Sequence, residues 1–106
     1  MCIESKGFKH VLCKTNSGSV ALSNCGCCFR IQYNNVLIYN DYQAFRKFYE
    51  NLQDCYEAVN GDKDGDERSI FFETRVENMM LSFSVLEIKE LHYLFESALI
   101  EYEVSL

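Results

Sequence analysis

Long apolar runs are missing from this chain of 106 residues, which also has no proline and no tryptophan. No segment approaches the roughly 18–20 apolar residues that a membrane-spanning helix requires, so a helical membrane protein is excluded. The segment Met1–Lys9 lacks the apolar stretch of a secretory signal peptide, so we expect a cytoplasmic protein. This length closes one hydrophobic core, and we expect a single domain over residues 1–106.

Signatures of the common enzyme classes are also missing. The chain has no glycine-rich phosphate-binding loop, no G-x-S-x-G nucleophile elbow and no H-E-x-x-H zinc motif. A thiol enzyme needs an orienting group and an oxyanion hole beside its Cys–His pair, and the sequence shows neither. His92 lies among apolar residues of the last expected helix, where we expect only a local hydrogen bond. These absences favour a non-enzymatic protein.

Positive charge is scarce: 10 lysines and arginines stand against 16 acidic residues, which gives a net charge of −6. An acidic protein repels phosphate backbones, and the basic residues form no cluster in the sequence. We therefore expect neither nucleic acid nor membrane as a partner. The 48% of hydrophobic and 25% of charged residues are ordinary for a globular protein, so disorder is not expected.

The first expected hairpin joins Phe8–Lys14 to Ser19–Asn24 through the polar turn Thr15–Gly18. Pairing Lys14 with Ser19 determines which side chains share a face of the sheet. One face then carries Val11, Cys13, Val20 and Leu22 toward the core, and the other carries His10, Leu12, Ala21 and Ser23.

Two further hairpins are expected. Residues Cys27–Tyr33 and Val36–Asn40 flank two asparagines, which tolerate the left-handed backbone of a tight turn. Residues Ile70–Arg75 and Met79–Phe83 form the third hairpin, with its turn near Glu77 and Asn78. Each of these hairpins is followed by a segment with helical spacing of its apolar residues.

Both helices are indicated by apolar stripes at three- and four-residue spacing. Asp41 is a suitable N-cap for the first helix, over about Tyr42–Val59. Ser84 and Glu87 have the spacing of a capping box, and the second helix is expected to end at about Glu103. The sequence therefore predicts an α+β fold in ββ-ββα-ββα order, a mostly antiparallel sheet of about six strands with both helices on one face.

Six cysteines are fewer than the roughly 8–10% that marks a disulfide scaffold, and we expect reduced thiols. The densest cluster is Cys25-Gly26-Cys27-Cys28. Strand alternation directs Cys27 inward and Cys28 outward, so the candidate zinc ligands are His10, Cys25 and Cys28, completed by Cys2. Zinc usually requires two spaced ligand pairs, and no second C-x-x-C occurs. We expect no cofactor, and keep a thiol-based metal (zinc) or redox site around Cys25–Cys28 as the alternative function.

The acidic segment Asp62–Asp66 resembles the opening of an EF-hand calcium loop, with Glu73 at the twelfth position. Glu67 stands where the loop needs glycine for its sharp turn, and Ser69 stands where an apolar residue is usual. The residues that follow, from Ile70, favour a strand rather than the helix of an EF-hand. We therefore expect a solvated loop that does not bind calcium.

Apolar residues also occur on the sheet face that the helices leave uncovered. An antiparallel sheet that faces water normally presents polar side chains there, and a contiguous apolar patch marks an association site. A two-fold axis pairs such a patch with itself, so we expect a homodimer. The leading hypothesis is a non-enzymatic interaction or self-association domain, with the interface residues Leu12, Leu37, Tyr39, Phe71 and Met80.

Three segments carry a family resemblance: Gly18-Ser19-Val20 through Cys25-Gly26-Cys27-Cys28, then Asn35-Val36-Leu37, and finally Leu81-Ser82-Phe83-Ser84 with Glu87 and Leu91. With these segments the chain resembles a family of short uncharacterised bacterial proteins over most of its length. The resemblance implies a small bacterial α+β protein of unknown function, and it carries no activity over to these residues.

Overall fold

The fold is described by a computed structural model for residues 7–63, 65 and 67–104, and it is the α+β fold that the sequence predicts. All strand pairs are antiparallel, and the order ββ-ββα-ββα is confirmed. The elements are β1 (His10–Lys14), β2 (Gly18–Leu22), β3 (Phe29–Tyr33), β4 (Val36–Asn40), α1 (Tyr42–Val59), β5 (Ile70–Glu73), β6 (Met80–Phe83) and α2 (Val85–Val104).

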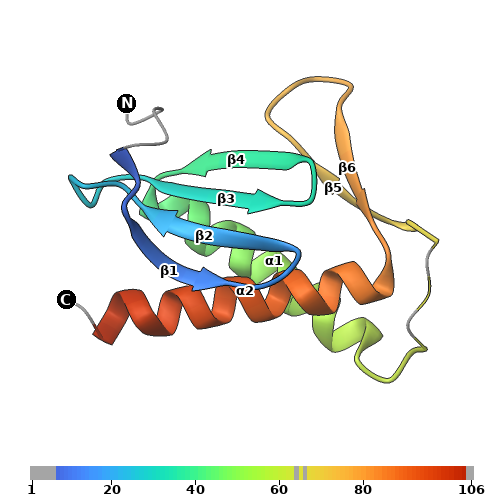
Figure 1. Ribbon diagram of the computed structural model, residues 1–106. Coiled ribbons are helices and arrows are strands. Elements are labelled where there is room, and N and C mark those ends of the chain that lie inside the picture. The colour runs from blue at the N-terminus through green and yellow to red at the C-terminus, as the bar shows by residue number, and fades with distance from the viewer. Residues whose placement is uncertain (1–6, 64, 66, 105–106) are drawn as a thin grey trace.

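The six strands of the described residues divide into two sheets, one with the order β1-β2-β3-β4 and one formed by β5 and β6 (Figure 1). The third hairpin does not pair with β4. It packs instead through Phe72, whose ring stacks on Phe48 of α1 at 5.4 Å, and through Phe83, whose ring meets Tyr33 at 6.5 Å. Burial of these two rings therefore holds the hairpin at the end of the core, although neither of its strands pairs with the four-stranded sheet.

Local signals in the sequence set the turns and the helix starts. Asp41 caps α1, because its carboxylate accepts a hydrogen bond from the Ala44 N–H at 2.7 Å. The turn between β3 and β4 holds Asn34 at φ 52°, and the turn of the third hairpin holds Asn78 at φ 61°. Helix α1 has its predicted bounds, and α2 ends at Val104, one residue beyond the expected end.

The core lies between the four-stranded sheet and the two helices. Helix α2 packs against β1 and β2, and α1 lies against α2 and β4. A stack of aromatic rings links the layers: Phe29 of β3 lies 4.5 Å from Phe45 of α1, and Phe45 lies 4.6 Å from Phe95 of α2. Such ring pairs add to the stability gained from burial itself.

The expected register of the first hairpin is wrong beyond Cys13. Cys13 pairs with Val20 as expected, but Val11 pairs with Ala21, because a β-bulge at Leu12 inserts one extra residue into β1. The bulge exchanges the faces of two neighbours. Leu12 is only 7% exposed and belongs to the main core, whereas Val11 is 49% exposed. Leu12 therefore does not lie on the uncovered face.

The opposite face of the four-stranded sheet is partly covered by the chain itself. Phe8 packs over Ala21 and Cys28 and forms a small second cluster, with Tyr39 half-buried at its side. The Phe8 and Tyr39 rings lie 5.6 Å apart, and the Arg30 guanidinium lies 5.2 Å from the Phe8 ring centroid. This face is therefore less apolar toward solvent than the hairpin registers alone predict.

Neither described helix combines the length and the apolar character that spanning a membrane requires.

Candidate functional site

A polar pocket of about 390 Å³ opens where two turns and the segment before β5 meet the start of α2. The β1–β2 turn contributes Ser17, the β3–β4 turn contributes Asn34, and the segment before β5 contributes Arg68. The remaining lining comes from the end of β3 and the first turns of α2: Tyr33, Ser84, Leu86, Glu87 and Glu90.

Glu87 is the hub of this pocket. It completes the predicted capping box: the Ser84 N–H donates to its carboxylate at 2.9 Å, and its own N–H donates to Ser84 Oγ at 3.2 Å. Arg68 adds a two-pronged ion pair, with Nε and Nη2 at 3.0 and 3.1 Å from the two carboxylate oxygens. Burial alone would raise the pKa of Glu87, but these hydrogen bonds outweigh it and lower the pKa.

Glu90 joins the same pocket to the sheet. The Tyr33 hydroxyl donates a short hydrogen bond to Glu90, and Ser17 Oγ donates to the second carboxylate oxygen at 3.3 Å. Burial raises the pKa of Tyr33, and the Glu90 carboxylate raises it further, so the phenol keeps its proton and remains a donor. Both carboxylates accept hydrogen bonds from donors in the surrounding segments. The pocket therefore fastens α2 to the turns and has the chemistry of a structural clamp.

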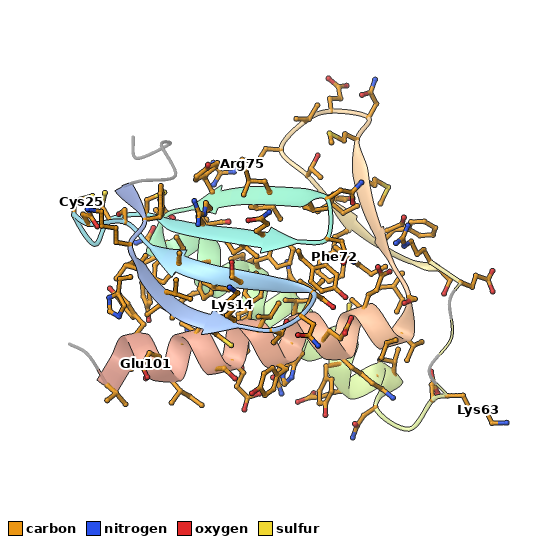
Figure 2. All side chains as sticks on the ribbon, in the orientation of Figure 1. Lys14, Cys25, Lys63, Phe72, Arg75 and Glu101 are labelled. Carbon is orange, nitrogen blue, oxygen red and sulfur yellow. The ribbon has the colours of Figure 1, made fainter. Side chains whose placement is uncertain are left out.

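The cysteine-rich loop lies at the other end of the four-stranded sheet, and Figure 2 labels Cys25 there. Strand β3 begins only at Phe29, so Cys27 lies in the loop and is exposed, not directed inward as the sequence predicts. Cys28 does face outward, but Phe8 buries it to 8% exposure. Burial raises the pKa of the Cys28 thiol, and the charges of Cys27 and Cys25 raise it further.

Three of the four candidate zinc ligands lie among the described residues. Within the described part of the chain, no group of three or more histidine, cysteine, aspartate or glutamate side chains is placed to hold a metal ion, and His10, Cys25 and Cys28 are no such group. Phe8 packs over Cys28 and limits the access of solvent to its thiol. Cys2, the expected fourth ligand, lies outside the described residues.

His92 has a local contact with Glu96, as expected, and in addition a hydrogen bond to Gln53 of the other helix that its position does not predict. Its ring is buried and stacks on Tyr56 of α1 at 4.0 Å, nearly parallel. Its Nε2 lies 2.6 Å from Gln53 Oε1 and 3.3 Å from the Glu96 carboxylate. The contacts with Tyr56 and Gln53 join α1 to α2, and the histidine serves the packing of the two helices.

The acidic loop continues into a strand. Asp64 and Asp66 lie outside the described residues. Strand β5 begins at Ile70, so residues 70–73 do not supply the exiting helix of an EF-hand. The absence of calcium binding stays a prediction.

The five expected interface residues lie in different surroundings. Leu37, Phe71 and Met80 are exposed, as the sequence predicts for the uncovered face. Tyr39 is half-buried against Phe8, and Leu12 is buried in the main core. Val76 and Met79 were not among the interface residues expected from the sequence. Both are exposed, and they flank the predicted turn at Glu77 and Asn78.

Comparison with known proteins places the chain in a family without assigning a function. No curated protein and no solved structure matches it. A family model described as a family of unknown function, DUF6686, matches residues 1–104, nearly the whole chain. The resemblance to an uncharacterised family of unknown function is thereby confirmed. The chain belongs to DUF6686.

Proposed function

We propose that the chain is a cytoplasmic self-association domain that forms a homodimer through its β5–β6 hairpin. The observation that carries this proposal is the two-sided character of the hairpin. Its inner face buries Phe72 and Phe83 in the core. Its outer face and tip expose four large apolar side chains, Phe71, Val76, Met79 and Met80.

The hairpin presents these side chains in a fixed arrangement. Glu73 pairs with Met80 and Phe71 pairs with Ser82, so Phe71 and Met80 are diagonal neighbours on one face. At the tip, Thr74 Oγ1 donates to the Met79 carbonyl at 2.8 Å and accepts from the Val76 N–H at 3.1 Å. A surface that is ordered before binding loses less entropy on association.

A second copy is the partner that this surface suits best. The hairpin carries acidic and basic side chains together, Glu73, Arg75 and Glu77, all exposed. A two-fold axis through the hairpin can place Arg75 of one copy against an acidic side chain of the other, around the apolar centre. Figure 1 shows the hairpin turn projecting beyond the four-stranded sheet, where a second copy can approach it.

Sedimentation equilibrium of the wild type and two matched variants tests the proposal. Phe71 of β5 is 60% exposed, and Ile100 of α2 is 59% exposed. Each position can therefore accept a lysine without loss of core packing. We expect a dimer at tens of micromolar for the wild type and for Ile100→Lys, and a monomer for Phe71→Lys. Leu37→Lys should weaken the dimer if β4 borders the interface.

Two outcomes contradict the proposal. A wild-type monomer at tens of micromolar removes self-association altogether. A dimer that survives Phe71→Lys but dissociates in Ile100→Lys moves the interface to α2, whose exposed Tyr93, Ile100 and Val104 are the competing apolar surface.

A further inference from the structure

Two thiols converge on one buried hydroxyl in the loop between β2 and β3. Ser23 Oγ lies 3.2 Å from Cys25 Sγ and 3.9 Å from Cys27 Sγ. Ser23 is only 2% exposed, whereas both cysteines are exposed to solvent. Figure 2 shows Cys25 at the end of the sheet that lies away from the β5–β6 hairpin, so this loop is separate from the proposed interface.

Backbone hydrogen bonds hold the loop in this shape. The Gly26 N–H donates to the Ser23 carbonyl at 2.9 Å, and the Ser23 N–H donates to the Cys28 carbonyl at 2.9 Å. Gly26 has φ 76°, a left-handed conformation that glycine adopts without steric cost. Even a straight chain separates Cα atoms two residues apart by at most about 7.6 Å. A disulfide joins Cα atoms about 4.4–6.8 Å apart, so its closure requires the chain to bend between Cys25 and Cys27, where Gly26 has its left-handed conformation.

We propose that Cys25 and Cys27 form a reversible disulfide by exchange with a low-molecular-weight disulfide such as oxidised glutathione. The Cys28 N–H donates to Ser23 Oγ at 3.1 Å, which leaves the hydroxyl proton of Ser23 for donation to a sulphur. Cys25 Sγ is the nearer sulphur, so Ser23 stabilises its thiolate. Ser23 is thus a positioning residue, and Cys25 is the attacking thiol.

The exchange takes place in two steps. The Cys25 thiolate attacks one sulphur of the small disulfide, forms a mixed disulfide and releases one small thiolate. Cys27, after losing its proton, attacks Cys25 Sγ, forms the Cys25–Cys27 bond and releases the second small thiolate. The protein gives up two electrons and two protons, which leave with two molecules of the small thiol. A disulfide that is exposed and closes so short a ring is readily reduced, which suits a switch.

The other cysteines of the described chain are less suited to this reaction. Burial raises the pKa of Cys13, Cys28 and Cys55, which keeps each of them protonated and slow to react. Cys28 is also shielded by Phe8. The reactive pair is therefore defined by exposure and by the contacts with Ser23.

Equilibration of the purified chain with mixtures of oxidised and reduced glutathione tests the proposal. After acid quenching and alkylation, peptide mapping should show a Cys25–Cys27 disulfide whose fraction rises with the oxidised share and disappears on reduction. Cys27→Ser should accumulate a glutathione adduct on Cys25, and Cys55→Ser should behave as wild type. A bond from Cys25 to Cys2 or Cys28, no disulfide in fully oxidised glutathione, or bound zinc that must be removed before oxidation would each overturn the proposal.

The role of Ser23 has its own measurement. In Ser23→Ala the labelling rate of Cys25 in the native protein should fall about threefold, because a roughly tenfold loss of thiolate is partly offset by the greater nucleophilicity of a thiolate with a higher pKa. Damage to the fold would have a different signature, because it would expose the buried Cys28 and raise the labelling rate of Cys28. An unchanged rate at Cys25 contradicts the assigned role. Dimer formation is measured independently, so failure of either proposal leaves the other intact.

Discussion

The β-bulge in β1 makes a sharp prediction about stability. The regular register that the sequence predicts buries Val11 and exposes Leu12, and the structure has the reverse arrangement. Truncating a buried leucine to alanine removes its burial energy and leaves a cavity, which together cost about 2–5 kcal/mol. Leu12 is 7% exposed within the main cluster, so Leu12→Ala should lower the free energy of unfolding by about 3 kcal/mol.

Val11→Ala is the matched control for that prediction. Val11 is about half exposed, so its truncation should cost no more than about 0.5 kcal/mol. With a urea m-value of about 2 kcal/mol/M, Leu12→Ala should lower the unfolding midpoint by about 1.5 M and Val11→Ala by about 0.25 M. Both variants must be compared with the wild type at one protein concentration, because the stability of a dimer depends on concentration. A larger loss in Val11→Ala than in Leu12→Ala would refute the bulge.

Three further predictions concern the pocket and the acidic loop. The folded pKa of Glu87 is lowered, so its contribution to stability is present above the ordinary glutamate pKa of about 4.3 and is lost as the pH falls through the folded value. Glu87→Gln should therefore flatten the acid limb of an unfolding curve measured against pH, and an unchanged limb contradicts the Arg68 ion pair. The raised pKa of Tyr33 should leave one phenol un-ionised in an ultraviolet titration above pH 10, and Tyr33→Phe should abolish that lagging fraction. Calcium titration by calorimetry at low salt should show no binding, and micromolar affinity would restore Asp62–Glu73 as a calcium loop.

Local signals account for the parts of the fold that the sequence predicts. Asp41 and the Ser84–Glu87 pair act within one helical turn, and Asn34 acts within one hairpin turn, so neighbouring residues suffice to identify them. Apolar periodicity identifies the buried faces of both helices, because burial of a stripe is what holds a helix in place.

Contacts between distant segments account for what was missed. A bulge shifts the register by one residue and carries no marker of its own in β1, since both Val11 and Leu12 are apolar. The burial of Cys28 depends on Phe8, some twenty residues earlier in the chain, and the separation of β5–β6 from β4 depends on the rings of α1. Of the candidate site, the Ser84–Glu87 contact was predictable, whereas its extension to Arg68 requires the folded path of the loop.

The position of α2 in the chain has a consequence for biosynthesis. This helix contributes Leu91, Leu94, Phe95 and Ala98 to the main core, yet these residues leave the ribosome after α1 and the six strands of the described chain. Until then the inner face of the four-stranded sheet and the apolar stripe of α1 can pack only against each other and the β5–β6 hairpin. Stable folding must therefore wait for a late segment to pair with early ones, the kind of long-range closure that folds slowly and exposes apolar surface meanwhile. Until α2 has been synthesised, the nascent chain therefore exposes apolar surface that the folded protein buries.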